Sequence, residues 1–159
     1  MNRHLAILKQ LYLKYILQNK KLVDSRWYIH KLTPWVQIST NDLLYLKLSG
    51  GPIKAICRTS EIKYLEIQDE KHYFEVVEQY KTALCLTNDF IEEKRRSRYC
   101  ILIWLKDVRP VIPEIRFEKH DQRSWLVNPP LPIDWQTKQE QYFFEIYPDL
   151  YKTEVDILQ

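Results

Sequence analysis

The alternation of hydrophobic and polar positions predicts a strand, a helix and a second strand at the start of the chain. Residues 4–8 form an apolar run typical of a short strand. Apolar residues then recur at helical spacing over residues 8–16, which predicts an amphipathic helix that ends near Asn19. Asn tolerates the left-handed conformation that often follows a helix. The next segment, residues 21–27, is therefore predicted to continue directly as a strand.

A Gly-Gly turn joins two further predicted strands. Residues 42–48 have the apolar-rich sequence DLLYLKL, and residues 53–67 form a longer run with a bend expected at residues 59–60. Between them lies Ser49-Gly50-Gly51-Pro52, which contains the only two glycines of the chain. Because glycine adopts the positive φ angles that tight turns need, the two segments are predicted to pair as a hairpin.

Two helices are predicted in the middle of the chain. The first covers residues 69–84, with Asp69 as its N-cap. We expect its buried face to carry four apolar residues: Phe74, Val77, Tyr80 and Leu84. The second is short and opens at Thr87 or Asn88. Its acidic residues come early and its basic residues late, which suits the helix dipole.

The strongest strand signal is YCILIWL, residues 99–105, which is apolar on both faces and therefore predicted to be central in a sheet. Pro110 and Pro113 are expected to end this strand, and residues 124–128 form a last short one. Because strands outnumber helices and hairpins favour antiparallel pairing, the pattern predicts an α+β protein built on a curved mixed sheet or small barrel.

The length of 159 residues and a hydrophobic content of 45% fit one domain with a substantial core. We expect residues 1–128 to form that domain. Residues 129–159 are rich in Pro and aromatic side chains. Such a segment is too aromatic for a free linker, so we expect it to pack as a C-terminal extension on the domain or on a partner.

Charge and cysteine content narrow the function only slightly. The net charge of +3 is compatible with a polyanionic partner without requiring one. The three Cys residues have no metal-site spacing and the four His residues are scattered, so no metal or cofactor is predicted. Polar residues interrupt the N-terminal apolar segment, and no run of 18 apolar residues follows it. We therefore expect a cytoplasmic protein with reduced thiols and no membrane partner.

Residues 19–26, Asn-Lys-Lys-Leu-Val-Asp-Ser-Arg, resemble the hallmark G-x-K-x-x-E-x-R of the ASCH domain, which belongs to the PUA-like superfamily. Lys21 and Arg26 match the pattern, and Asp24 replaces its Glu with the charge kept. Asn19 replaces its Gly with the other residue that tolerates a left-handed cap. The segments YLKLSGGP, SRYCILIWL and FEKHDQRSWLV also resemble this family, and the resemblance covers roughly residues 4–128.

The resemblance implies a PUA-like fold: a small curved β-barrel of about five to six mixed strands with flanking helices, and a cleft beside the first helix. It also implies binding of RNA or of a modified nucleoside. Some small members of the family hydrolyse acylated cytidine with a Lys, a Thr and a Glu. Lys21 matches that Lys, but Asp24 stands where that subgroup has Thr. This departure argues against that particular activity.

The residues of the hallmark have their own chemistry. In a strand, Asp24 and Arg26 point to the same side and can pair. Arg26 can hold a phosphate or a base edge while Asp24 orients it or accepts a base N–H. Lys21 can contact an anion or, with a lowered pKa, act as a base or nucleophile. The alternative is a structural Asp-Arg pair beside a solvated Lys.

Other residues are candidates for the same cleft. Ser49 and the backbone of Gly50 can contact an anion, or they can form a plain hairpin turn. Arg98 and Tyr99 follow a basic run and combine a phosphate contact with a ring for stacking, although the run can also be a solvated helix end. Trp27 is the best candidate for a wall of an aromatic cage, although a Trp is more often part of the core.

Three functions remain open from the sequence. The first is a module that binds RNA or a nucleotide in a basic cleft formed by the residues named above. The second is a small hydrolase of an acylated nucleoside or of RNA, with Lys21 as base or nucleophile and Asp24 as its partner. The third is a protein-interaction module that uses the C-terminal extension.

Overall fold

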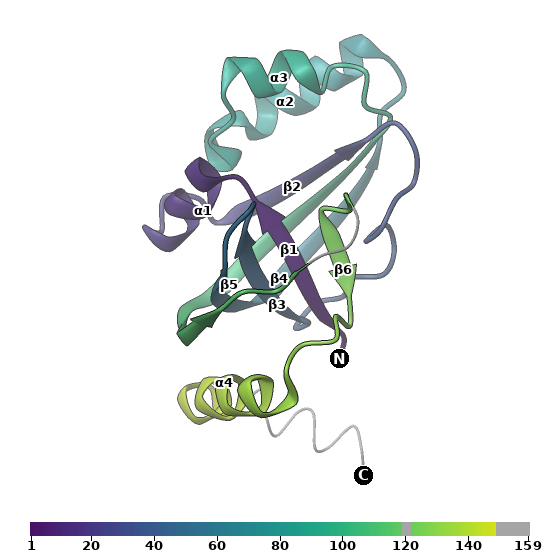
Figure 1. The fold of residues 1–159 in the computed structure, drawn as a ribbon. Coiled ribbons are helices and arrows are strands. Elements are labelled where there is room, and N and C mark those ends of the chain that lie inside the picture. The colour runs from purple at the N-terminus through teal and green to yellow at the C-terminus, as the bar shows by residue number, and fades with distance from the viewer. Residues whose placement is uncertain (119–121, 149–159) are drawn as a thin grey trace.

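The computed structural model describes residues 1–118 and 122–148, and these form a single six-stranded sheet with four helices (Figure 1). The strands are β1 Arg3–Leu8, β2 Val23–Tyr28, β3 Leu43–Leu48, β4 Ile53–Glu66, β5 Tyr99–Ile115 and β6 Trp125–Val127. The helices are α1 Gln10–Leu17, α2 Glu70–Leu84, α3 Asn88–Glu93 and α4 Ile133–Ile146. None of the helices among these residues is long and apolar enough to cross a membrane.

The sheet is mixed and strongly curled, in the order β2-β5-β4-β3-β1-β6. β1 and β3 run parallel, with His4 opposite Leu44, and the other neighbouring strands are antiparallel. α2 and α3 lie together at one end of the curled sheet, and α4 lies at the opposite end (Figure 1). The α+β class and the curved, barrel-like sheet with flanking helices are confirmed.

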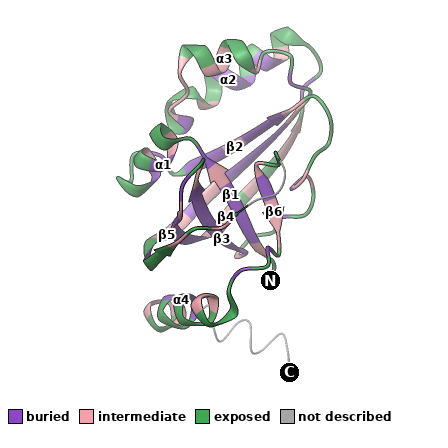
Figure 2. Cartoon of the chain, in the orientation of Figure 1, coloured by how far each residue is buried: buried purple, intermediate pink, exposed green. Residues whose placement is uncertain are grey.

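Three apolar clusters hold the fold together, and buried positions concentrate on the strands (Figure 2). The first cluster fills the inside of the curl, where Leu44 and Ile101 are fully buried beneath α1. The second lies on the opposite face and is covered by Phe143 of α4. The third joins β2 and β5 to α2. Most strand residues are therefore buried or partly buried, and the exposed ones lie in the second halves of β4 and β5.

Local signals predicted several element ends. Asn19 has a φ angle of 58°, and Gly50 has 71° in the turn between β3 and β4. The carboxylate of Asp69 accepts a hydrogen bond from the backbone N–H of His72 at 2.8 Å and caps α2. The register of β4 against β5 shifts between Thr59 and Glu61, where the bend was expected.

The predicted buried face of α2 is correct at Val77 and Leu84, which are buried, and wrong at Phe74. Phe74 is 38% exposed, whereas its neighbour Tyr73 is fully buried. The Tyr73 ring packs edge-on against Trp27 at 5.4 Å, and its hydroxyl donates to the carbonyl of Ile91 at 2.7 Å. A buried tyrosine needs such a partner for its hydroxyl, so this contact decides which aromatic residue of the pair turns inward.

Pro110 and Pro113 do not end the strand that contains them, because β5 continues to Ile115. The reason lies in the neighbours of β5. Its pairing with β2 stops at Trp104, and beyond this point its pairs are with β4 alone, as in Ala55 opposite Pro110. Proline lacks the N–H of a central strand but is tolerated where one edge of a strand has no partner.

Candidate functional site

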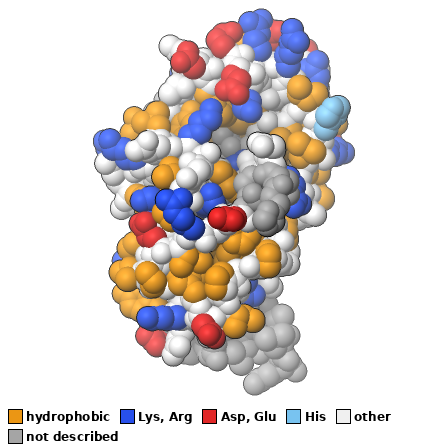
Figure 3. Space-filling model, viewed as in Figure 1, with side chains coloured by type: hydrophobic (Ala, Val, Ile, Leu, Met, Phe, Trp, Pro, Cys, Tyr) orange, Lys and Arg blue, Asp and Glu red, His pale blue; other side chains and the backbone are white. Residues whose placement is uncertain are grey.

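A cavity of about 260 Å³ lies along β2, which is an edge strand of the sheet. Its walls come from the end of β1, from α1, from β2, from α3 and from Ser124 just before β6. Five of the predicted site residues line it: Lys21, Asp24, Arg26, Trp27 and Ser49. The visible face of the molecule carries Lys and Arg in scattered positions and not in one continuous patch (Figure 3). Within the cavity, by contrast, three buried charged residues lie together: Lys21, Asp24 and Arg26.

The order of local structure explains how the hallmark reaches the cavity. After α1, the backbone N–H groups of Lys20 and Lys21 both donate to the carbonyl of Tyr15, which closes the helix in a tight turn. β2 then begins at Val23 and pairs with β5. Asp24 lies opposite Ile103 in that pairing, so its side chain points toward the inside of the curl.

Arg26 is the most constrained charged side chain of the cavity. It is 8% exposed, and its Nε donates to Asp24 Oδ2 at 2.9 Å. Its Nη1 donates to the carbonyls of Ile7 at 3.1 Å and Ser124 at 3.2 Å. Its Nη2 is buried and has no hydrogen-bond partner. Because an unpaired buried donor costs about 1–3 kcal/mol and more on a charged group, this atom is the donor of Arg26 that would gain most from an acceptor.

Lys21 is even more buried, at 2% exposure. Its ammonium donates to the carbonyl of Leu84 at the C-terminal end of α2 and lies 5.1 Å from the centre of the Tyr12 ring. Burial lowers the pKa of Lys21, and the negative charge of Asp24 opposes that shift. The helix C-terminus and the aromatic ring both favour the charged form. The cavity thus holds a second desolvated cation with donors left over.

The residues predicted for the Gly-Gly turn and for the aromatic cage differ in how they relate to the cavity. Ser49 is an exposed part of the cavity rim, and its backbone N–H donates to the carbonyl of Leu8 at 2.8 Å. Gly50 is outside the lining. Trp27 lines the cavity, but it is only 4% exposed and its indole N–H donates to the Ser25 hydroxyl at 2.8 Å. Trp27 is therefore mainly a wall that packs on α2.

Arg98 and Tyr99 do not join the cavity lining. Arg98 is exposed, and its backbone N–H donates to the carbonyl of Tyr28 at 2.8 Å. The Tyr99 ring packs against Trp35 at 5.2 Å, and the Lys31 ammonium lies 5.5 Å from that ring. Their position after a basic run of the sequence had suggested that they share a cleft with Lys21 and Arg26. The packing of the Trp35 loop against Tyr99 places these two residues apart from Lys21 and Arg26.

Several lining residues were not singled out from the sequence. Tyr12 of α1, Tyr28 of β2 and Phe90 of α3 add aromatic surface. At the rim, Glu93 lies between two lysines, with its carboxylate 3.9 Å from Lys9 and 4.0 Å from Lys94. The helical spacing around Tyr12 predicted only that this residue lies on the apolar face of the first helix, and not that it lines a cavity. No local pattern indicates that Phe90, more than sixty positions from Arg26, shares a cavity with it.

The charged and aromatic side chains of the cavity are of the kinds that proteins use for hydrolysis, for recognition of a base and for binding of an anion. Among the residues that the structure describes, no group of three or more His, Cys, Asp or Glu side chains is placed to hold a metal ion. The cavity offers a buried guanidinium, a buried ammonium, one buried carboxylate and aromatic walls. This set can bind a flat ring that carries hydrogen-bond acceptors, or an anionic group of similar size.

Comparison with solved structures identifies the class of fold. The ASCH protein of Zymomonas mobilis aligns with a TM-score of 0.62 at 12% identity, over 86% of this chain and 92% of that one. Its Ser-to-Ala variant gives 0.63 at 12% identity, over 88% and 95%. The N-terminal domain of McrB from Staphylothermus marinus gives 0.51 at 12% identity, over 84% and 91%. No family model matches this chain, and no curated protein matches it in sequence.

These alignments show that the chain has the fold of an ASCH domain, which confirms the resemblance at the level of fold. The identities are too low to carry an activity from those proteins to this one.

Proposed function

We propose that this protein binds a single nucleotide, either free or as an unstacked unit of RNA, in the cavity along β2. The observation that carries the proposal is the unpartnered Nη2 of Arg26 in a cavity that also contains the buried Lys21. Two desolvated cations with open donors favour a ligand rich in acceptor oxygens. A phosphate or the carbonyl of a base supplies such oxygens.

The walls and the size of the cavity support a nucleotide over a simple anion. Tyr12, Tyr28 and Phe90 provide rings against which a base can stack, and stacking on aromatic side chains is a common mode of recognition of unpaired bases. A volume of about 260 Å³ lies just below the range of about 300–1,000 Å³ for drug-sized ligands. The cavity is therefore suited to one nucleotide unit and not to several.

Asp24 adds a means of selection. One of its oxygens accepts from Arg26, and a carboxylate retains acceptor capacity at the other. A base that presents an amino or imino N–H beside a carbonyl can pair with Asp24 and Arg26 together. A ligand with acceptors alone fills only the Arg26 side of this arrangement.

Calorimetric titration with the four ribonucleoside monophosphates and with a short single-stranded RNA tests the proposal. Arg26→Met and Lys21→Met each remove a charge-assisted contact worth about 1.5–3 kcal/mol, so affinity is expected to fall by about tenfold or more. Arg95→Met is the matched control, because Arg95 is exposed and pairs with Glu70 and Glu92 outside the cavity. Equal affinities in all four proteins overturn the proposal.

The titration with RNA gives a further test, which is the dependence of affinity on salt concentration. Binding that includes phosphate contacts weakens steeply as salt rises, whereas a contact made by a buried cation is screened much less. Comparing the salt dependence of RNA with that of the mononucleotide separates contacts along the chain from those inside the cavity. Binding of RNA that is insensitive to salt argues against an RNA ligand and leaves the mononucleotide.

A hydrolase is the second candidate, and one observation favours it. Burial lowers the pKa of Lys21 inside a cavity that also contains Asp24, so a larger fraction of the amine is available as a base or nucleophile. Incubation with a panel of acylated nucleosides and short RNAs, with metal chelated, is expected to give product with the wild type and none with Lys21→Met. Identical product yields with both proteins exclude this function.

A further inference from the structure

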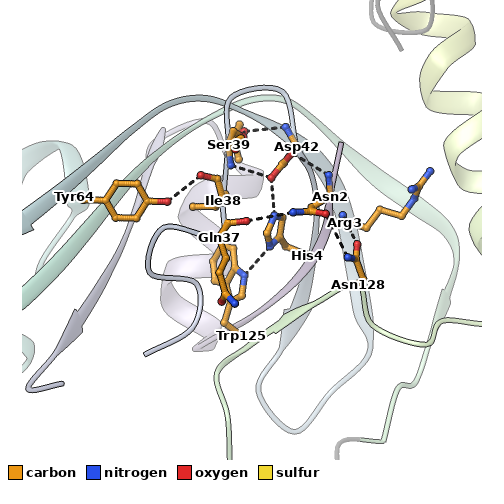
Figure 4. Close-up of polar contacts among 11 residues, drawn as sticks. Asn2, Arg3, His4, Gln37, Ile38, Ser39, Asp42, Tyr64, Trp125 and Asn128 are labelled. Atoms are coloured by element: carbon orange, nitrogen blue, oxygen red, sulfur yellow. Dashed lines mark hydrogen bonds and ion pairs between the residues drawn. The ribbon is translucent and has the colours of Figure 1, made fainter. Parts of the chain in front are cut away.

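A buried chain of polar side chains runs behind Arg26, away from the hallmark motif. It consists of Asp42 just before β3, His4 of β1 and Trp125 of β6 (Figure 4). His4 Nε2 lies 2.8 Å from Asp42 Oδ2, and the Trp125 indole N–H donates to His4 Nδ1 at 3.0 Å. All three side chains are almost completely buried.

The chemistry of the three groups fixes the direction of the hydrogen bonds. An indole N–H can only donate, so Nδ1 of His4 must be the acceptor and Nε2 must carry the proton. Nε2–H then donates to Asp42, which also accepts from the backbone N–H groups of Ser39 at 2.9 Å and Asn2 at 3.1 Å. Although burial raises it, these hydrogen bonds hold the pKa of Asp42 below its ordinary value. His4 is thus a neutral connector between a carboxylate and an indole.

This series of buried polar side chains ends at Arg26, which lines the cavity. The Trp125 ring lies 5.1 Å from the centre of the Arg26 guanidinium, and the carbonyl of the adjacent Ser124 accepts from Arg26 Nη1. The pairing of β1 with β6, in which Ala6 lies opposite Trp125, places both groups. With Nε bound to Asp24 and the face covered by the indole, the guanidinium has one orientation and Nη2 as its one unpartnered nitrogen among the hydrogen bonds of the described residues.

We propose that His4 and Trp125 are positioning residues of the nucleotide site, which act by holding Arg26 so that Nη2 stays open to the ligand. This inference rests on the function proposed above. In it, Asp42 orients His4, His4 orients the indole of Trp125, and the indole orients the guanidinium. A purely structural role of the same residues would stabilise the fold without any specific effect on Arg26.

The first test follows Arg26 in the ligand-free protein. The side-chain Nε–H of Arg26 is observed by ¹⁵N NMR, and its exchange with water is measured. His4→Ala and Trp125→Leu are expected to accelerate this exchange about tenfold, because the indole no longer restrains the guanidinium. His4→Gln, whose amide can still donate to Asp42, and Trp125→Phe, which keeps a ring on Arg26, are expected to restore most of the protection.

Val111→Ala is the matched control, because Val111 is buried in the cluster on the opposite face of the sheet. It is expected to lower stability and leave the exchange of Arg26 Nε–H unchanged. If His4→Gln and Trp125→Phe fold and all the variants, Val111→Ala included, alter the exchange equally, the contact is only structural and the inference is overturned. If the exchange is unaffected in every folded variant, the inference is also overturned.

The second test is a double-mutant cycle on nucleotide affinity. His4→Ala and Trp125→Leu are expected to weaken binding by about threefold to tenfold in the wild type and to have no further effect in Arg26→Met, because they act through Arg26. His4→Gln and Trp125→Phe, which keep Arg26 restrained, are expected to retain most of the affinity. Additive losses overturn the inference. A wild type that binds no nucleotide refutes the proposed function instead, and the exchange measurement then decides the positioning role by itself.

Discussion

The two charged residues of β2, Asp24 and Arg26, form a buried ion pair. Asp24 and Arg26 are joined at 2.9 Å, and both side chains are less than a tenth exposed. A pair of this kind gains little over a well-packed apolar pair, but removal of one partner leaves an uncompensated buried charge. The pair is therefore best understood as a device that orients Arg26, at a cost in stability if it is broken on one side.

Asp24→Ala is predicted to lower the free energy of unfolding by about 3–5 kcal/mol, because Arg26 then remains buried without its carboxylate. The double variant Asp24→Leu/Arg26→Met is predicted to recover most of that loss. Urea denaturation measures both. A double variant that is as unstable as the sum of the single variants would show that the charges themselves stabilise the fold.

The burial of Lys21 predicts that the free energy of unfolding changes with pH in the alkaline range. Burial lowers its pKa in the folded protein, whereas the unfolded chain keeps a value near 10.5. Between these two values the unfolded chain binds more protons, so this residue makes the free energy of unfolding rise with pH. Below the folded value both states are protonated and the contribution is constant.

The measurement is the difference in free energy of unfolding between wild type and Lys21→Met across that alkaline window. The difference is predicted to shift in favour of the wild type as pH rises, while Lys20→Met, at an exposed position next to it, should follow the wild type in parallel. Parallel profiles for all three proteins would mean that Lys21 is solvated.

Among the elements, α2 has the most influence on the cavity, because its last carbonyl binds Lys21 and its inner face packs on Trp27. The cap of this helix is set locally by Asp69. Its rotation is set by tertiary contacts of Tyr73. A periodic pattern defines a stripe about a hundred degrees wide, so it cannot decide between two adjacent aromatic residues.

Asp69→Ala is predicted to destabilise the protein by about 1 kcal/mol, within the range of about 0.5–2 kcal/mol for the loss of an N-cap. Thermal or urea unfolding gives the value. Glu78→Ala, on the exposed side of the same helix, removes only a surface pair with Lys81 and is expected to change stability by less than about 0.5 kcal/mol. Equal effects of the two changes would deny Asp69 its capping role.

At the scale of the molecule, α4 packs on the sheet and shares its apolar core. Phe143 of α4 is 1% exposed in the cluster that includes Tyr45 and Val111 of the sheet. Trp135 also packs on Tyr45 at 5.6 Å, and its indole N–H donates to the carbonyl of Pro113 at 2.8 Å. We propose that residues 129–148 complete the domain. The apolar face of α4 is occupied by its own sheet, which leaves less support for its use as a partner-binding helix.

Phe143→Ala is predicted to cost about 3–5 kcal/mol, the usual value for a fully buried aromatic side chain. Tyr142→Ala is the neighbouring control, because Tyr142 is 58% exposed, and its effect should stay below about 0.5 kcal/mol. Both are measured by urea denaturation with a single transition. A small effect of Phe143→Ala would mean that α4 is an appendage in solution and not part of the core.

The alternation within one strand was enough to place Asp24 and Arg26 on the same side, and the motif at Asn19 was enough to place the end of α1. Such features depend on residues a few positions apart, whose geometry is fixed by the backbone. For the same reason the sequence predicted the hairpin at Gly50 and the cap at Asp69. These local rules, with the resemblance, also sufficed for the class of fold.

Only the tertiary structure decided which residues share the cavity. The carbonyl of Ser124, 98 positions from Arg26, holds the guanidinium, and His4 is joined to Trp125 across 121 positions. Arg98 and Tyr99 were expected beside Arg26, yet the sheet directs them elsewhere. Pairing between distant strands depends on the whole set of competing contacts, and a backbone carbonyl carries no mark in the sequence. The amino-acid sequence thus determined the charged residues of the site, and the curl of the sheet decided what surrounds them.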